Sequence, residues 1–475
     1  MSSQSEIINS LTTKLSQSQS ECDDNCECSK FDNYIGSGGF GKVYEVKGTN
    51  LVNKEMDLRY DENIREICFL STYKHIPFIT QFNKCEIDSV KNTLNLYMEN
   101  AGSSLRDLSK TMKIEDKIKL VPTLMVQFAR ILIWMKQENI LHCDIKPANI
   151  CIDNELNIKL IDWGFVQRFM PNKKYKIGTQ VFYDPYTYEN KIDYKSELFA
   201  FGITICYFIM SGFDYDDWEN FCLDFDDKNS CTFKTDSDKI IELNEEALNI
   251  FNIEKTIQKF IDVHGHSDYY ELLIEMINID PECRIEIEDL YDELPVELKL
   301  KYPLTECYTH LYDDDIINTY SLLNINKKAI SVVIDWMISI KFTFSIKYSL
   351  LDAIILLIRY LELEKTNTVD IPCVATVCLY IANVINCEGI LDIQKCTMLC
   401  SLKTKNEMMS LMKKILTTLN YEVYPDKNNK EYNKKNEDLW KMTLLDSNFQ
   451  LNTSNLSHIL FDKIYNINKK YLRSK

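Results

Sequence analysis

The sequence predicts an α+β fold followed by a separate all-α region, and three observations support this. Short segments between residues 35 and 100 alternate apolar and polar residues in the manner of β-strands. From Leu120 to Glu138 the apolar residues recur at helical spacing, and long apolar helical segments dominate residues 305–425. With 475 residues and 45% hydrophobic content, the chain can form two or three domains with substantial cores.

Charge and cysteine usage limit the function classes. A net charge of −17 argues against nonspecific nucleic-acid binding, which needs basic surface to displace counterions. The 17 cysteines show no short-spaced disulfide framework and no signal peptide is recognisable. We therefore expect reduced thiols and a cytoplasmic location, in the host cytoplasm if the source is viral, with nuclear or virion locations left open. The apolar run 348–363 contains Asp352, Arg359 and Glu362, which predicts a buried helix and no membrane span.

Two polar stretches have a plain interpretation and a functional alternative. Residues 1–28 are rich in Ser, Gln, Asp and Glu, and we interpret them as a disordered leader. Its Cys22, Cys26 and Cys28 are explained more simply as chance thiols than as a metal site, because no second ligand pair follows at zinc-site spacing. The acidic residues 213–260 are interpreted as a solvated loop with helices, and a docking patch for basic partners is the alternative.

A glycine-rich segment, IGSGGFGKV, begins at Ile35. Gly36, Gly38 and Gly41 form a G-x-G-x-x-G pattern, in which unhindered backbone N–H groups can approach phosphates. Dinucleotide-binding proteins share this pattern, but there the glycines open a helix. Here KVYEVKG follows and alternates like a strand, so a strand–turn–strand flap is predicted. A plain glycine-rich hairpin is the structural alternative.

The segment HCDIKPAN contains the residue types that phosphoryl transfer requires. Asp144 can act as the base for an incoming hydroxyl, Lys146 can stabilise developing negative charge, and Asn149 offers a neutral oxygen ligand for Mg²⁺. A second aspartate, Asp162, follows in the sequence DWG, after two short alternating segments joined by a predicted Asn-Glu turn.

Taken in order, these motifs resemble those of protein kinases. HCDIKPAN resembles the catalytic loop HRDxKxxN, DWG resembles the DFG motif, and GTQVFYDP resembles the close of the activation segment. Lys54 in LVNKEMD and Glu66 in NIREICFL match the strand lysine and the helix glutamate of the family. The resemblance implies a bilobal protein kinase fold for residues 29–300, with ATP and Mg²⁺ as cofactors.

The resemblance also implies a role for each matching residue. Asp144 would accept the proton of a serine or threonine hydroxyl, with Lys146 two residues later as in serine/threonine kinases. Lys54, held by Glu66, would position the α- and β-phosphates, while Asn149 and Asp162 would bind Mg²⁺. The remaining nucleotide-binding positions would be those of the glycine loop, the strand lysine and the segment after the gatekeeper: Ile35, Gly36, Ser37, Gly38, Gly39, Phe40, Gly41, Lys42, Val43, Lys54, Met98, Glu99 and Ala101.

Four positions depart from the family pattern. Cys143 replaces an arginine that binds the activation-segment phosphate, so we expect activity that does not strictly depend on that phosphate. Trp163 replaces phenylalanine and can fill the same packing role. Tyr186 replaces a glutamate, which would leave Arg284 without its usual partner unless Glu189 substitutes. The fourth departure is Glu197, which replaces the aspartate that braces the catalytic loop.

Residues 305–425 resemble a cyclin box, with Asp335 and Trp336 as the most specific pair. Taken as a whole, the chain resembles kinase/cyclin fusion proteins of giant DNA viruses. The resemblance implies a kinase partner, either a cyclin-dependent kinase or the chain's own kinase domain, with docking on the Glu66 helix. Val384 and Asn386 stand near positions where cyclins carry charged contact residues, which argues against the usual contact. A generic helical bundle is the structural alternative, and residues 426–475 are predicted to be polar and then helical.

Two functions follow from the sequence. The first is an active serine/threonine kinase with protein substrates, activated in cis by its cyclin-like part. The second is a non-catalytic scaffold whose cyclin-like part binds another kinase; Cys143, Tyr186 and Glu197 favour it. All residues expected to touch ATP or metal are present, which favours the first.

Overall fold

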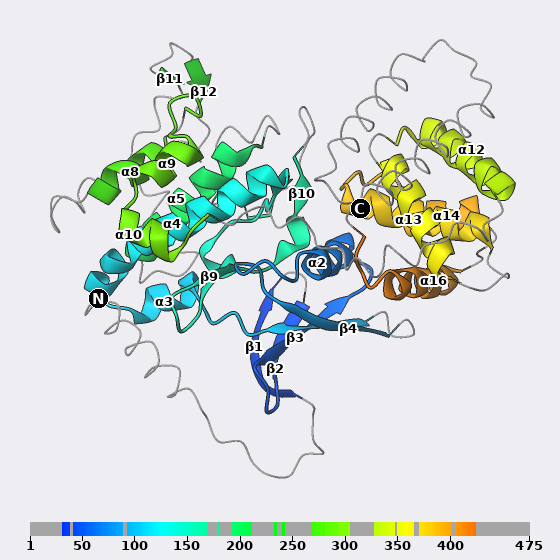
Figure 1. Ribbon diagram of the computed structural model, residues 1–475, viewed down its shortest axis with the longest axis horizontal. Coiled ribbons are helices and arrows are strands. Elements are labelled where there is room, and N and C mark those ends of the chain that lie inside the picture. Colours follow the sequence, from blue (N-terminus) through cyan, green and yellow to red (C-terminus); the bar gives the residue numbers. More distant parts are fainter. Residues whose placement is uncertain are drawn as a thin grey trace.

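In a computed structural model of the protein, the described part of the chain comprises most of the predicted folded regions. The described residues are 31–38, 41–88, 93–169, 178–179, 182, 184, 192–210, 232–234, 240–242, 268–278, 280–304, 327–346, 349–364, 370–400, 402 and 404–423. The predicted leader with Cys22, Cys26 and Cys28, most of the acidic stretch, Glu189 and the tail after residue 425 lie outside them. The predicted class, an α+β domain followed by an all-α domain, is confirmed (Figure 1).

The N-terminal lobe is an antiparallel five-stranded sheet of order β1-β2-β3-β5-β4. One helix, α2 (Asp61–Thr72), is inserted between β3 and β4. Ten of its twelve residues are buried, so α2 is covered on both sides rather than on the sheet side alone. The strands are β1 (Phe31–Gly38), β2 (Gly41–Val46), β3 (Leu51–Asp57), β4 (Phe82–Asp88) and β5 (Thr93–Glu99).

The second lobe is built around two apolar helices, α4 (Ile114–Gln137) and α5 (Tyr194–Met210). By length and composition α4 could cross a membrane, but 78% of its most apolar window is buried, which is typical of a core helix. Smaller helices surround this pair: α3 (Leu105–Thr111), α8 (Asp268–Met276), α9 (Ile287–Glu293) and α10 (Val296–Lys301).

Short strands and turns carry the predicted motif residues between the lobes. The Asn-Glu turn predicted from the sequence joins β8 (Ile150–Ile152) to β9 (Ile158–Leu160). The other elements are β6 (Ser103–Ser104), β7 (Ile140–Leu141), β10 (Gln167–Arg168), the hairpin β11 (Thr232–Lys234) and β12 (Ile240–Glu242), and the 3₁₀ turns η1 (Pro147–Asn149) and η2 (Trp163–Phe165).

The all-α domain surrounds one central helix, α14 (Ile371–Ile385). Thirteen of its fifteen residues are buried, as expected for a helix that is apolar on every side. The Asp370 side chain accepts a hydrogen bond from the Cys373 N–H and so caps its first turn. The helices around it are α12 (Lys327–Phe344), α13 (Ser349–Leu363), α15 (Ile393–Leu399) and α16 (Lys405–Thr418).

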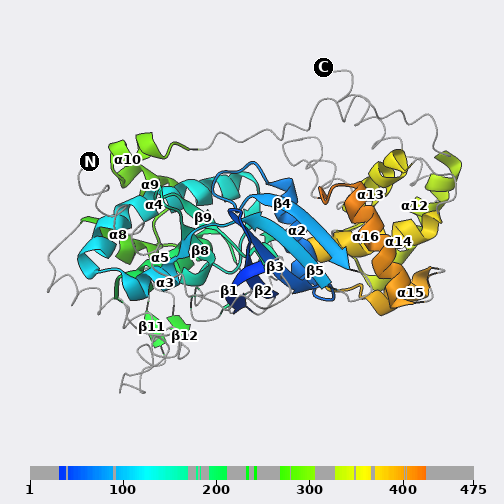
Figure 2. The same ribbon diagram turned by 90° about the horizontal axis from the view of Figure 1, so that it is seen from below.

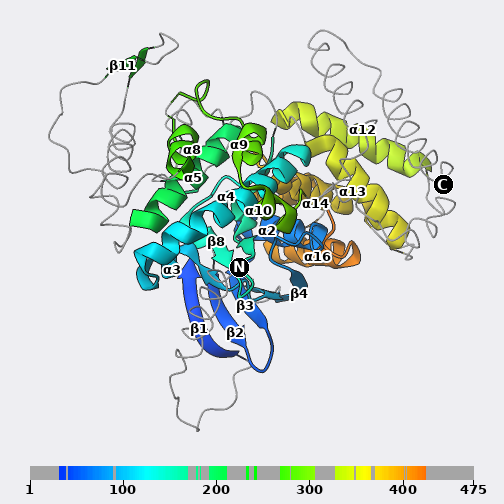
Figure 3. The same cartoon turned by 60° about the vertical axis from the view of Figure 1, so that its left-hand side comes forward.

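The all-α domain lies against α2 on the side away from the sheet. Viewed from below, α2 stands between strands β4 and β5 and the helices α14 and α16 (Figure 2). A view turned about the vertical axis again shows α16 beside α2 (Figure 3). The predicted docking of this region on the Glu66 helix is therefore present within the single chain.

Candidate active site

Lys54 stands at the centre of a buried ion cluster. It lies on β3, where residues 52–54 are all buried. Its Nζ donates to both oxygens of Glu66 on α2, at 2.9 and 2.7 Å, and to Oδ1 of Asp162 at 2.8 Å. One ammonium thus joins the sheet, the helix and the DWG segment, as sequence comparison with the family implied for Lys54 and Glu66.

Burial and charge act in opposite directions within this cluster. Burial disfavours the Lys54 ammonium, but the two carboxylates outweigh it and the pKa of Lys54 is raised. Asp162 is half-buried, which tends to raise its pKa, yet Lys54 holds that pKa below the ordinary value. Burial and the nearby Asp162 charge raise the pKa of Glu66 to about 7, with Lys54 acting against them. Of the two carboxylates, Glu66 is therefore the one that takes up a proton as pH falls.

The second cluster is centred on Asp144 in the catalytic loop. Its Oδ2 accepts hydrogen bonds from Lys146 Nζ at 2.8 Å and from Asn149 Nδ2 at 2.9 Å. Its Oδ1 accepts from the Thr179 N–H and hydroxyl, both at 2.9 Å, and Lys146 also reaches that hydroxyl at 2.8 Å. The three predicted residues of this loop are therefore assembled, together with the activation-segment threonine.

Gly178 allows this close approach of the activation segment. A Cβ atom at this position would lie 2.1 Å from Asp144 Oδ1, closer than atoms can approach. The Gly178 N–H also donates to the Cys143 carbonyl at 3.0 Å, so the segment is fixed to the loop on both sides of Asp144. Any larger residue would displace the carboxylate or the segment.

Asp162 and Asn149 provide oxygen donors of the kind that Mg²⁺ prefers. Asp162 adopts the left-handed conformation (φ 63°), which aspartate tolerates better than most residues, and Lys54 occupies only its Oδ1. The Asn149 amide nitrogen donates to Asp144, which turns the amide oxygen the other way. A carboxylate and an amide oxygen, both hard ligands, fit a magnesium ion and its phosphate ligands.

The glycine segment forms the predicted strand–turn–strand flap. Strands β1 and β2 pair with Gly36 opposite Val43, Ser37 opposite Lys42 and Gly38 opposite Gly41. Gly39 and Phe40, at the tip, lie outside the described residues. Ile35, on β1 of this flap, is 51% exposed.

The predicted adenine-binding segment follows β5. Met98 and Ala101 are buried, and Met98 stands opposite Val52 in the β3–β5 register. The Glu99 side chain forms an ion pair with Lys159 and accepts from the Gln81 N–H at 2.8 Å. The Glu99 side chain is therefore occupied in fixing the segment, and the Glu99 N–H also donates to the Gln81 carbonyl at 3.0 Å.

A stack of rings connects α2 to the catalytic loop. Trp163 of the DWG motif stacks on Phe69 of α2, with ring centroids 4.2 Å apart and planes at 21°. The His142 ring lies 4.5 Å from Trp163 on the other side, and the indole N–H donates to the Leu160 carbonyl at 3.1 Å. Trp163 thus fills the packing role predicted for it, with its polar atom satisfied.

Glu197 braces the catalytic loop despite its longer side chain. Its Oε1 accepts from the Cys143 N–H at 2.7 Å, and Cys143 adopts a left-handed conformation (φ 62°) that turns this N–H toward α5. Burial raises the pKa of Glu197 to about 7, although the N–H groups of Cys143 and His142 favour the charged form.

This pKa predicts a dependence of stability on pH. The pKa of Glu197 is higher in the folded chain than its ordinary value of 4.5, so its stabilising contribution is complete below that value and is lost as pH rises through 7. Between about pH 5.5 and pH 8, the free energy of unfolding should therefore fall further in the wild type than in Glu197→Gln, by on the order of 1–2 kcal/mol. Urea unfolding of both chains at the two pH values measures this difference. An equal fall in the free energy of unfolding in the wild type and in Glu197→Gln would contradict the prediction.

The expectation for Arg284 was wrong. Arg284 has a buried carboxylate partner although Tyr186 stands at the glutamate position: its Nη1 lies 2.7 Å from Oδ2 of Asp184, and both side chains are fully buried. Asp184 precedes Pro185 in YDP, where the resemblance pointed to an alanine. The carboxylate has moved two positions along the chain, and the buried charge of Arg284 therefore remains paired.

Sequence reasoning also missed most contacts between the two domains. Arg65, next to Glu66, donates from Nη1 to the Gly164 carbonyl and from Nε to the Val384 carbonyl of α14 at 3.1 Å. The Tyr380 hydroxyl donates to Asp61 Oδ1 at 2.8 Å at the start of α2. The signal that could have identified Arg65 is the NIREI segment, in which Arg65 directly precedes Glu66.

The C-terminal end of α2 contacts the residues that follow α16. Ser71 donates to the Asn420 carbonyl at 2.8 Å, and Lys74 pairs with Glu422 at 3.1 Å. Both ends of α2 are thus held by the all-α domain. Val384 and Asn420 take part through backbone carbonyls, which explains how contact is made without the charged cyclin side chains.

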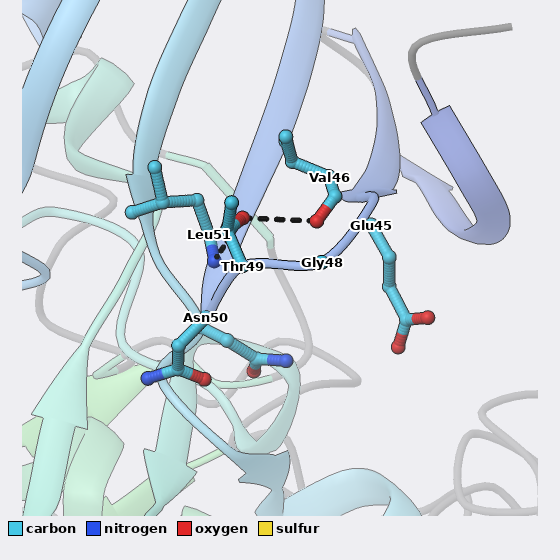
Figure 4. Close-up of a pocket in the computed structure, with 7 residues that line it drawn as sticks. Glu45, Val46, Gly48, Thr49, Asn50 and Leu51 are labelled. Carbon is cyan, nitrogen blue, oxygen red and sulfur yellow. Dashed lines mark hydrogen bonds between the residues drawn. The ribbon is translucent and has the colours of Figure 1, made fainter.

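A separate pocket lies at the turn between β2 and β3 (Figure 4). The Thr49 hydroxyl donates to the Val46 carbonyl at 2.9 Å and accepts from the Leu51 N–H at 3.2 Å, so the turn fixes itself. No residue of the candidate site lines this pocket, which is formed by Glu45, Val46, Gly48, Thr49, Asn50, Leu51 and Asn100.

Comparisons with known proteins agree with this geometry. Residues 29–294 match the model of the protein kinase domain, and residues 302–424 match that of the cyclin N-terminal domain. The chain is 31% identical over 189 residues to the serine/threonine-protein kinase KIC1 of Saccharomyces cerevisiae, covering 36% of this chain and 17% of that protein. It is 28% identical over 196 residues to the cAMP-dependent protein kinase catalytic subunit of Dictyostelium discoideum, covering 38% and 30%.

A viral protein is among the relatives. A putative serine/threonine-protein kinase/receptor of Acanthamoeba polyphaga mimivirus is 33% identical over 192 residues, covering 37% of this chain and 11% of that protein. The chain therefore spans between 11% and 30% of the length of these three relatives.

Proposed function

Because this chain belongs to the protein kinase family, we propose that it transfers the γ-phosphoryl group of ATP to serine or threonine hydroxyls of proteins. The observation that carries the proposal is the joint assembly of the two clusters. Lys54 is held between Glu66 and Asp162, while Asp144 is held between Lys146, Asn149 and Thr179. Catalysis by such a site is mainly positioning and electrostatic stabilisation.

Each residue has a defined task in this reaction. Asp144 orients the substrate hydroxyl and accepts its proton, and Lys146 stabilises the charge that develops on the transferred phosphoryl group. Lys54, oriented by Glu66, binds the α- and β-phosphates under the glycine flap. Asn149 and Asp162 would hold Mg²⁺, which neutralises phosphate charge when bound. Lys146 bonded to Thr179 favours serine and threonine substrates, since this pair belongs to that class of kinase.

The test is phosphate transfer by the purified full-length chain. With magnesium, γ-labelled ATP and a basic protein substrate, we expect label on serine and threonine and none on tyrosine after acid hydrolysis. Omitting magnesium, with chelator present, is the control and should abolish transfer. Failure of the folded chain to label itself or any of several protein substrates would contradict the proposal.

The all-α domain has a function in cis under the same proposal. It holds both ends of α2, the helix that carries Glu66, through Tyr380 and the Asn420 carbonyl. A helix fixed at both ends keeps Glu66 turned toward Lys54, and the open alternative loses this contact. The cyclin-like domain therefore activates its own kinase domain.

Two features that favoured a scaffold no longer do so. The glutamate lost at Tyr186 is replaced by Asp184, and Glu197 braces the loop in place of aspartate. Capture of a second kinase is also disfavoured, because the face that would receive it contacts α2 of the same chain.

A further inference from the structure

A buried arginine stands at the start of the activation segment. Arg168 lies on β10, directly after the DWG turn, and is 6% exposed. Strand β10 pairs with β7, with Gln167 opposite Leu141 and Arg168 opposite Ile140. Strand β7 leads directly into the loop that carries Asp144. The position of β10 therefore determines how the activation segment leaves the catalytic loop.

The anionic partner of Arg168 comes from the other domain. Its Nη1 lies 3.3 Å from Oδ2 of Asp352 on α13, and the Asp352 side chain is 3% exposed. Asn386, just after α14, donates from Nδ2 to the same carboxylate oxygen at 2.8 Å and fixes its orientation. A buried guanidinium without an anion costs several kcal/mol, so the Asp352 carboxylate of the all-α domain stabilises β10 in this place.

The neighbouring groups indicate that the Asp352 carboxylate has a structural role beside the activation segment. Cys143 stands beside the segment where an arginine could bind a phosphate, and a thiol cannot do so. Two N–H groups of Arg65 are directed at the carbonyls of Gly164 and Val384. Arg65 is thus engaged with the DWG turn and the all-α domain, while Lys146 is bonded to Asp144 and Thr179.

We infer that Asp352 is a positioning residue for phosphoryl transfer: its carboxylate fixes the start of the activation segment through Arg168 and takes the place of a phosphate on that segment. The inference rests on the proposed kinase function and deepens it. The start of the segment, β10, is then held in place by domain docking, and Asn386 belongs to the same device because it holds the carboxylate.

The test uses full-length chains with Asp352→Asn, which keeps the side-chain shape and removes the charge. We expect kcat/KM for a peptide substrate to fall by at least about tenfold, because the segment carries the peptide platform. The KM for ATP should stay unchanged, because Lys54, Glu66 and Asp162 are not involved. Neutralising both partners, in Asp352→Asn with Arg168→Gln, should restore the thermal stability lost in the single variant, since no uncompensated charge remains, while kcat/KM stays low because the ion pair that fixes β10 is absent.

Matched measurements decide the outcome. Glu288→Gln removes an exposed ion pair, to Lys136, within the second lobe and away from the interface, and should leave kcat/KM unchanged. Phosphatase treatment of the wild type should also leave it unchanged. Asp352→Asn that behaves as wild type, a double variant that regains the wild-type kcat/KM, or loss of wild-type activity after phosphatase treatment would each overturn the inference. An inactive wild type would overturn the kinase proposal itself.

Discussion

Replacing Asp162 with asparagine should lower kcat by about 10³-fold without unfolding the chain. The carboxylate is expected to hold the metal that neutralises phosphate charge, and such stabilisation is worth several kcal/mol in the transition state. Asparagine has the same shape, and Lys54 keeps its second partner, Glu66, so the cluster can still form. Steady-state phosphorylation of a peptide measures the effect, and a thermal melt within a few degrees of wild type shows that the fold is retained.

The control for this variant is Asp116→Asn. Asp116 lies in the first turn of α4, where its side chain is 30% exposed and its nearest ion-pair contact, to Lys119, is 3.8 Å long. The same chemical change there should alter kcat by less than about twofold, because exposed pairs contribute little. A folded Asp162→Asn variant that retains more than about a tenth of the wild-type rate would remove Asp162 from the metal site.

The candidate site could be predicted because its chemistry restricts residue type and spacing together. A base, a cation and an oxygen ligand for Mg²⁺ within eight residues leave few alternatives at Asp144, Lys146 and Asn149. The α+β class followed from alternation in the first hundred residues and helical spacing later. These signals are local, and a single sequence contains them in full.

Pairings over long distances could not be predicted in the same way. Asp184 binds Arg284, and Asp352 binds Arg168, yet each pair joins residues far apart in the chain and nothing local marks either carboxylate. An acidic residue is usually solvent-exposed, so the expectation for any single one is correctly a surface position. Only packing of the domains shows which of them have lost water and therefore need a cation.

The domain contact was predicted in location but not in chemistry. The cyclin resemblance identified α2, which carries Glu66, as the docking helix, and the absence of charged residues at Val384 and Asn386 argued against the usual contact there. The structure resolves this because carbonyl oxygens at Val384 and Asn420 accept the hydrogen bonds. Backbone acceptors are present at every residue, so no side-chain pattern can reveal which of them will be used.

Separating the two domains with Ser71→Asp should lower kcat by about 10²-fold. Ser71 is fully buried on α2 and its hydroxyl donates to the Asn420 carbonyl. A carboxylate there would face that carbonyl without a proton to donate, and a buried uncompensated charge costs several kcal/mol, so the interface should open. With α2 released at this end, Glu66 spends less time on Lys54, and each 1.4 kcal/mol of lost preference lowers the rate tenfold.

Two measurements separate this effect from simple loss of fold. X-ray scattering should show a larger radius of gyration for Ser71→Asp, and hydrogen exchange should rise in α2 while α4 stays protected. Ser71→Ala is the matched control: it removes one hydrogen bond, worth about 1 kcal/mol, and should keep the domains together and the rate within a few-fold. If Ser71→Asp opens the chain and kcat is unchanged, Glu66 stays on Lys54 unaided, and the cyclin-like domain has another role than activation in cis.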